Sequence, residues 1–103
     1  MRSTYGVGRD WPFTYDDLEP YYGEAERIMS ISGSDEPSPS PRSSPYPQPP
    51  HRYSVLAKLL KDAFPEHVFP QPTARARRAV PNQRPACCSN NVCHHCPIDA
   101  KFT

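Results

Sequence analysis

Proline constrains the fold of this chain more than any other residue type. The 103 residues include 15 prolines, about three times the usual share of roughly 5%. Because proline fixes φ and has no backbone N–H, most of these positions cannot lie inside a helix or a central strand. Hydrophobic residues make up only 36% of the chain, against about 45–50% in average globular domains when glycine is counted. We therefore expect the chain to need a cofactor, a metal or the rest of a larger protein to complete its core.

The first segment, 1–33, is predicted to contain a helix over about 14–30. Thr14 is a good N-cap, and Asp16 and Asp17 fall in the first turn, where carboxylates favour the positive end of the helix dipole. Pro20 predicts a kink or a restart, and Gly33 predicts the end of the helical segment. Apolar side chains recur at the spacing of one buried helical stripe: Leu18, Tyr21, Tyr22, Ala25, Ile28 and Met29.

A second short helix is predicted over about 54–64. Ser54 is its expected N-cap and Pro65 its expected end. The apolar stripe of this helix would consist of Leu56, Leu59, Leu60 and Ala63.

A proline-rich linker, 34–53, separates the two helices. Its central part, "DEPSPSPRSSPYPQPP", has seven prolines in sixteen residues. Such a composition favours extended, polyproline-like chain that lies over a surface or in solvent. Two short helices joined by this linker do not close a core, so we expect no complete domain.

The charge balance gives no general attraction to nucleic acid or to an anionic membrane. The formal net charge is +1, from 12 basic and 11 acidic residues. The basic run "ARARRAV", 74–80, has no interleaved aromatic residues and is predicted to be a solvated loop. No apolar run is long enough to span a bilayer, and the first residues lack the apolar core of a signal peptide. No nucleic-acid partner is expected.

The segment 84–103, "RPACCSNNVCHHCPIDAKFT", holds every cysteine of the chain and is the candidate metal site. Its pattern is C-C-x4-C-x2-C-P, formed by Cys87, Cys88, Cys93 and Cys96. A disulfide framework is disfavoured because the loops it would close are short. A catalytic thiol is disfavoured because that role needs one activated cysteine, although His94 and His95 stand beside Cys93.

Two metal centres remain open on spacing alone. Cys93 and Cys96 form a zinc-knuckle-like pair, but adjacent cysteines such as Cys87 and Cys88 are awkward ligands for a single zinc ion. An iron–sulfur cluster offers several iron atoms, so adjacent thiolates can reach different irons. The Asn-Asn pair between the cysteines suits a tight loop that tolerates left-handed backbone and directs amides at the sulfurs of such a cluster.

Two stretches resemble a known family. "YGVGRDWPFTYDDLEPYYGEAERIMSISG" is similar to a stretch of the glucose–methanol–choline (GMC) oxidoreductases, which are flavoproteins that oxidise alcohols. "RPACCSNNVCHHCPIDAKFT" resembles the cysteine loop of one branch, the catalytic subunits of bacterial FAD-dependent sugar and polyol dehydrogenases, where the loop holds a 3Fe–4S cluster. The resemblance implies that Cys87, Cys88 and Cys93 are cluster ligands and that Cys96 is a spare thiol.

The resemblance also implies a fold and a place in it. Residues 1–103 would be an internal fragment of an α/β (α+β) GMC-type FAD-binding fold, itself mostly irregular. The chain has no G-x-G-x-x-G loop for the FAD pyrophosphate. None of His51, His67, His94 and His95 stands in the motif of the family's catalytic histidine. We therefore expect no catalytic and no FAD-binding residues in this segment, and neither activity nor flavin binding from the segment alone.

The function implied for the parent protein is oxidation of a CH–OH group of a sugar, polyol or other alcohol. A histidine base would take the hydroxyl proton, hydride would pass to FAD, and electrons would leave through the cysteine loop. The implied partners are the remainder of the chain, a small chaperone-like subunit and a cytochrome c subunit, at the periplasmic face of the inner membrane. The competing interpretations are a small zinc-bound, proline-rich interaction module and a truncated product without function.

Overall fold

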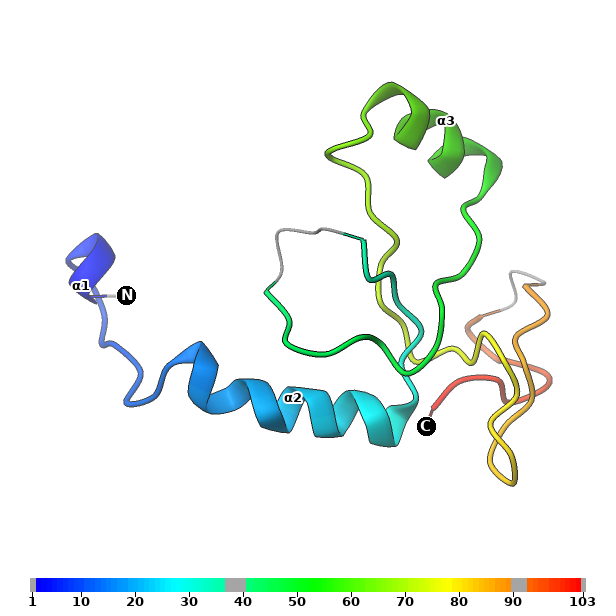
Figure 1. Cartoon of the computed structure of the whole chain (residues 1–103), viewed down its shortest axis with the longest axis horizontal. Helices are drawn as coiled ribbons and strands as arrows, with labels where there is room; N and C mark the ends of the chain where they lie inside the picture. Colours follow the sequence, from blue (N-terminus) through cyan, green and yellow to red (C-terminus); the bar gives the residue numbers. More distant parts are fainter. Residues whose placement is uncertain (1, 37–40, 90–92, 103) are drawn as a thin grey trace.

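The computed structural model describes residues 2–36, 41–89 and 93–102. Its helices are α1 (Arg2–Tyr5), α2 (Tyr15–Met29) and α3 (Val55–Ala63) (Figure 1). The described residues form no sheet, only single β-bridges. The two predicted helices and the mostly irregular remainder are confirmed, whereas the four-residue α1 was not predicted. None of the described helices has the length and apolarity that crossing a lipid bilayer requires.

Helix α2 begins at a capping box. The Thr14 hydroxyl accepts a hydrogen bond from the Asp17 N–H at 3.4 Å, and the Asp17 carboxylate accepts one from the Thr14 N–H at 2.7 Å. The backbone bond from Thr14 and the hydroxyl bond lower the pKa of Asp17 below its usual value. The helix continues through Pro20 without a restart, so this part of the prediction was wrong. Pro20 removes one intrahelical bond, to the Asp16 carbonyl, and the helix continues on either side of it.

Helix α2 ends at Met29, close to the predicted bound of about 30, and the residue that caps it is Ser30 rather than Gly33. Ser30 has φ 47° and ψ 57°, in the left-handed region. Its N–H bonds the Arg27 carbonyl at 3.1 Å, and the Ile31 N–H bonds the Glu26 carbonyl at 3.0 Å. These are the two bonds of a Schellman motif, which usually has glycine at the left-handed position. A serine therefore occupies a position that glycine would fill with less strain.

Replacing Ser30 with glycine is expected to stabilise the chain by about 0.5–1 kcal/mol. The left-handed conformation costs a non-glycine residue about 1–2 kcal/mol, and the greater freedom of glycine in the unfolded chain offsets part of that gain. Urea unfolding followed by far-UV circular dichroism measures the change. Ser30→Ala is the matched control, because alanine retains the strain and should give no gain. Equal stability of the two variants would contradict the left-handed cap.

Helix α3 begins at its predicted cap, since the Ser54 hydroxyl accepts a hydrogen bond from the Ala57 N–H at 3.1 Å. It ends at Phe64, next to Pro65. The predicted apolar stripe is not buried, because Leu56 is 67% exposed and Leu59 is 62% exposed. In Figure 1, α3 lies at the far end of a long excursion of the chain. No other described segment covers its apolar side chains.

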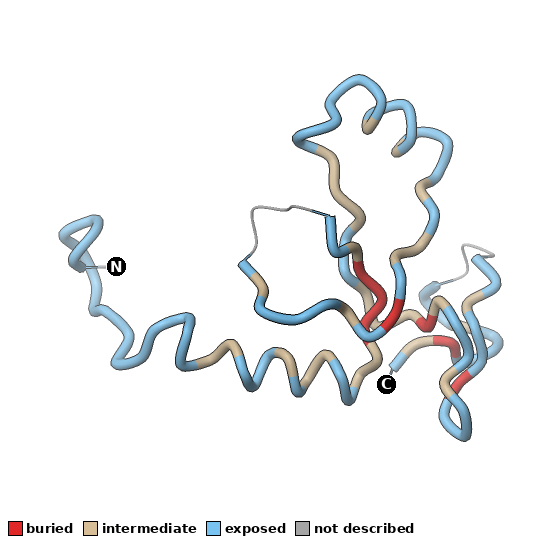
Figure 2. Tube along the Cα trace, viewed as in Figure 1, coloured by how far each residue is buried: buried red, intermediate tan, exposed pale blue. Residues whose placement is uncertain are grey.

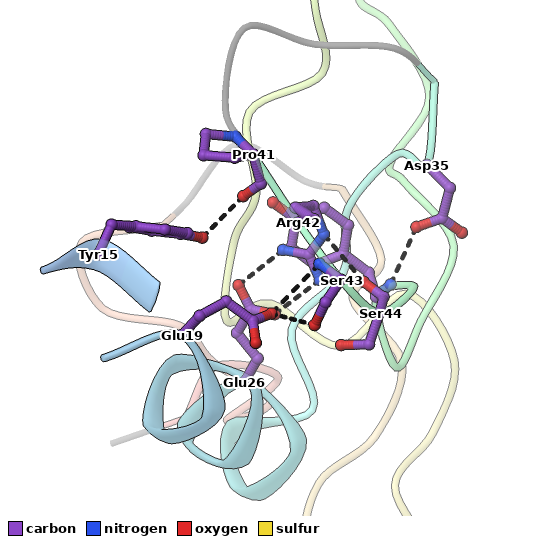
Figure 3. Close-up of polar contacts among 9 residues, drawn as sticks. Tyr15, Glu19, Glu26, Asp35, Pro41, Arg42, Ser43 and Ser44 are labelled. Atoms are coloured by element: carbon purple, nitrogen blue, oxygen red, sulfur yellow. Dashed lines mark hydrogen bonds and ion pairs between the residues drawn. The ribbon is translucent and has the colours of Figure 1, made fainter. Parts of the chain in front are cut away.

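The described end of the proline-rich linker packs on α2 (Figure 3). The Arg42 guanidinium makes two hydrogen bonds to the Glu26 carboxylate, at 2.9 and 2.8 Å. The Tyr15 hydroxyl donates to the Pro41 carbonyl at 2.7 Å, and the Ser43 hydroxyl donates to the Glu19 carboxylate. These polar contacts hold the linker beside the helix. Residues 37–40 of the predicted linker lie outside the described residues.

The buried centre of the chain lies just after α2, around Ser32 (Figure 2). The Ser32 backbone exchanges two hydrogen bonds with Thr73, at 2.9 and 3.0 Å, and the Gly33 N–H donates to the Gln48 carbonyl at 3.0 Å. The Ser32 side chain is completely buried. Its hydroxyl donates to the Arg75 carbonyl at 2.8 Å and accepts from the Arg77 N–H at 3.1 Å.

The charge pattern predicts that the basic run is a solvated loop. This prediction was wrong. Its backbone is held by Ser32, and Ala76 in its middle is completely buried. The arginine side chains lie at the margin of this centre, because alternate residues of extended chain face opposite sides. Within this run, Arg78 is exposed, as expected for a solvated segment.

The chain is extended for its length. Its radius of gyration is 16.7 Å, compared with about 13 Å for a compact domain of this size. Large apolar side chains such as Trp11, Tyr21 and Val55 are 70% exposed or more. The buried centre is therefore small, and backbone hydrogen bonds around Ser32 hold the segments together more than apolar burial does.

Candidate functional site

Both ends of the cysteine loop are attached to one residue, Ala76. The Cys87 N–H donates to the Ala76 carbonyl at 2.8 Å, and the Ala76 N–H donates to the Ala100 carbonyl at 2.8 Å. Ala100, like Ala76, is buried. The Phe102 N–H adds a further bond to the Ala74 carbonyl at 3.0 Å. The loop from Cys87 to Ala100 is thus closed at a buried backbone neck.

A tight turn brings the chain back from the basic run to Cys87. The Gln83 N–H donates to the Val80 carbonyl at 3.0 Å, and the Val80 N–H donates to the Arg84 carbonyl at 2.9 Å. Pro81 and Asn82 are the two central residues, and Asn82 has φ 59°. Proline followed by a residue of positive φ is the pattern of a type II turn, and asparagine tolerates that conformation.

Arg84 joins the cysteine loop to the end of α2. It is 7% exposed, and its guanidinium donates a hydrogen bond to the Met29 carbonyl. The guanidinium carbon also lies 5.5 Å from the centroid of the Phe102 ring, within cation–π range. One side chain therefore contacts the last turn of the helix and the far end of the loop.

The four predicted metal ligands are all free thiols. Cys87 and Cys96 are half-buried, whereas Cys88 and Cys93 are exposed. Within residues 2–36, 41–89 and 93–102, no three His, Cys, Asp or Glu side chains gather closely enough to hold a metal ion. The part of the predicted loop at 90–92 lies outside the described residues. The assignment of these cysteines to a metal stays a prediction.

Several donors in the loop favour thiolates. The Cys96 sulfur accepts the Ala100 N–H at 3.4 Å, and the Cys87 sulfur accepts the Ser89 N–H at 3.4 Å. Backbone bonds from Ala100 and Ile98, with the positive charge of Lys101, lower the pKa of the Cys96 thiol below its ordinary value. The Lys101 ammonium also donates to the Cys93 carbonyl. This end of the loop therefore stabilises negative charge on sulfur.

The histidines have different surroundings. The rings of His94 and His95 are exposed and meet edge to face, with centroids 4.7 Å apart. The His51 ring lies 3.1 Å from the Arg75 carbonyl. Burial lowers the pKa of His51 below 6.5. The hydrogen bond to the Arg75 carbonyl acts in the opposite direction, whereas the charges of Arg75 and Arg77 lower the pKa further. His67 is an exposed residue beyond α3.

The sequence did not point to the residues that fix the loop. Ala76 and Ala100 are small apolar residues in irregular chain, where no period marks a buried position. Ser32 and Arg84 are polar residues whose burial follows only from contacts with distant segments. The one local signal was the Pro-Asn pair at 81–82, which is typical of a turn.

Comparison with known proteins places the whole chain beside two oxidoreductases. It is 41% identical over 108 residues to the fructose dehydrogenase large subunit of Gluconobacter japonicus, covering 99% of this chain and 20% of that protein. It is 35% identical over 103 residues to the 6'''-hydroxyparomomycin C oxidase of Streptomyces lividus, covering 95% of this chain and 19% of that protein. No protein-family model matches the chain.

The chain thus spans about a fifth of the length of these relatives. The similarity includes the helical segment, the proline-rich linker and the cysteine loop, because nearly every residue of this chain is aligned. The chain is homologous to a segment of about 100 residues in two larger oxidoreductases.

Proposed function

We propose that this chain is a segment of an FAD-dependent GMC oxidoreductase that oxidises the CH–OH group of a sugar, polyol or other alcohol. The observation that carries this proposal is the 41% identity to the fructose dehydrogenase large subunit over 99% of the chain. The second relative is an oxidase of a compound named as hydroxylated. Both names fit a parent protein that removes electrons from an alcohol, and FAD would accept the hydride there.

Within that parent, the segment 84–103 would provide the electron exit. The donor set fits an iron–sulfur cluster, since four free cysteines supply soft thiolate ligands. The backbone N–H group directed at the sulfur of Cys87 is of the kind that tunes such clusters. A bound 3Fe–4S cluster would accept and release single electrons. Cys87, Cys88 and Cys93 are the proposed ligands and Cys96 the proposed spare.

The proposed partners are those implied by the branch that the cysteine loop resembles. They are the remainder of the oxidoreductase chain, a small chaperone-like subunit and a cytochrome c subunit, at the periplasmic face of the inner membrane. The name of the first relative, a large subunit, fits an enzyme built from more than one chain. The exposed apolar residues of α3 are consistent with contacts to the remainder of the parent.

Anaerobic reconstitution with iron and sulfide tests the proposed cluster. The chain is expected to take up about three irons and four sulfides and to absorb visible light as 3Fe–4S proteins do. Cys88→Ser and Cys93→Ser should each abolish this absorption. Cys96→Ser should retain it if Cys96 is the spare thiol, and Ser89→Ala, beside the ligands, serves as the matched control.

The competing zinc module gives a different result. Stoichiometric zinc after purification, with no iron uptake and no visible absorption, would contradict the cluster and favour a zinc-bound interaction module. Loss of the absorption in Cys96→Ser would contradict only the spare thiol and would assign four ligands. Metal analysis together with visible and electron paramagnetic resonance spectra separates these outcomes.

A further inference from the structure

A pocket lies between the start of α3 and the basic run, next to the cysteine loop. It has a volume of about 730 Å³, within the range of roughly 300–1,000 Å³ that small-molecule sites occupy. Its polar lining consists mainly of His51, Arg52, Ser54, Arg75, Arg77 and Ser89. The proposed electron exit and the proposed parent activity make no use of this pocket.

The pocket has uncompensated positive charge. Three arginines line it, and no carboxylate does. Over the described parts of the chain, three glutamates, Glu24, Glu26 and Glu36, pair instead with Arg27, Arg42 and Lys61. The field of Arg75 and Arg77 reaches His51, where it disfavours the protonated ring. An anion entering the pocket would meet guanidinium groups that have no acidic partner within the described residues.

The alternation of the basic run explains this arrangement. Ala76 lies on the buried side of the extended segment, and its two neighbours, Arg75 and Arg77, line the pocket on the other side. Their backbones are fixed by the Ser32 hydroxyl, which bonds the Arg75 carbonyl and the Arg77 N–H. The two arginines are thus presented from a rigid part of the molecule.

The lining of the pocket also includes the residue at the start of a helix. Ser54 is the N-cap of the nine-residue helix α3, and the first-turn N–H groups of a helix favour anions. Arg52 precedes this cap by two residues. Ser54 and the three arginines therefore line one cavity, together with Ser89, two residues after Cys87.

We propose that this pocket binds the phosphate group of a small molecule. Guanidinium groups match the geometry of phosphate oxygens and form charge-assisted, bidentate hydrogen bonds with them. A phosphate carries more negative charge than a single carboxylate, so it neutralises the charge of three arginines more fully. The ligand could be free phosphate or a diphosphate-bearing compound, and the two are separated by experiment.

The test is a titration of the ¹⁵N-labelled full chain with inorganic phosphate at constant ionic strength, followed by amide NMR shifts. Saturable shifts are expected at His51, Arg52, Arg75 and Arg77. Arg75→Gln and Arg77→Gln should each weaken phosphate binding about tenfold, the loss expected for a charge-assisted hydrogen bond. Arg52→Gln alters an exposed side chain, so it tests the pocket even if the other variants unfold.

Controls separate a site from general charge attraction. Arg9→Gln removes the same charge from the exposed N-terminal segment and should leave phosphate binding unchanged. Acetate should bind at least tenfold more weakly than phosphate. Pyrophosphate binding tenfold tighter than phosphate would identify a diphosphate-bearing ligand, and equal binding would identify a single phosphate group. Shifts that do not saturate, or equal weakening by Arg9→Gln and Arg52→Gln, would overturn the proposal.

Discussion

Replacing Gly33 with alanine is expected to destabilise the chain by about 2–3 kcal/mol, near the upper end of overpacking effects. A Cβ atom at Gly33 would lie 2.6 Å from both Cγ and Cε2 of the Tyr46 ring, far inside van der Waals contact. The ring cannot move freely, because the Arg42 guanidinium carbon lies 3.3 Å from its centroid and Asp35 accepts the Tyr46 N–H at 3.0 Å. Urea unfolding measures the loss.

Gly23→Ala is the matched control, with an effect of opposite sign. Gly23 lies inside α2, and a Cβ there would meet only the Ser44 hydroxyl oxygen at 3.8 Å, an ordinary contact. Alanine should therefore stabilise the helix by about 1 kcal/mol. Adding Tyr46→Ala to Gly33→Ala should reduce the cost of the alanine, because the clash is removed. A neutral Gly33→Ala would show that Tyr46 does not pack on Gly33.

Replacing Ser32 with alanine is expected to cost about 2–4 kcal/mol, the second of the two largest effects. The substitution removes the hydroxyl from a completely buried side chain. The Arg77 N–H loses its side-chain partner, and a buried group left unpaired costs about 1–3 kcal/mol. The Arg75 carbonyl loses one of its two bonds, worth about 0.5–1.5 kcal/mol, and keeps the bond to the His51 ring. Unfolding midpoints give the total, and hydrogen exchange of the Arg77 amide reports the local loss.

Ser34→Ala serves as the comparison for Ser32→Ala. The Ser34 hydroxyl accepts one exposed hydrogen bond, from the Glu36 N–H at 3.2 Å. Its loss should cost about 0.5 kcal/mol or less, because water replaces an exposed partner. Similar losses at the two serines, or an unchanged exchange rate at Arg77, would mean that Ser32 does not organise the basic run.

The helices could be predicted because their signals are local. Thr14 with Asp17 and Ser54 with the following apolar residues mark helix starts within four positions of the chain. The end of α2 was predicted to within about a residue, but its capping residue could not be, because a serine adopts the left-handed conformation that normally indicates glycine. The sequence favoured Gly33 as the end of the helical segment. In the structure, the missing side chain of Gly33 leaves room for the Tyr46 ring.

The buried centre could not be predicted, because single residues from distant segments form it. Ser32, Gln48, Thr73 and Ala76 make isolated bridges or single bonds, and none belongs to a periodic pattern. The charge of the basic run predicted that this segment is exposed to solvent, yet its backbone forms hydrogen bonds with the buried Ser32 side chain. The cysteines could be proposed as ligands from sequence because thiols at close spacing indicate shared ligation by their chemistry, whatever the fold.

The attachment of both ends of the cysteine loop to Ala76 has a consequence for how this segment can change. The loop is closed by backbone bonds that belong to Cys87, Ala76 and Ala100, so its interior can lengthen without shifting the rest of the molecule. The entropic free-energy cost of closing a loop rises slowly with loop length, by about 0.6 kcal/mol for each doubling. One residue more or less between the cysteines would thus cost far less than that. The backbone neck at Ala76 is therefore compatible with more than one spacing of the thiols.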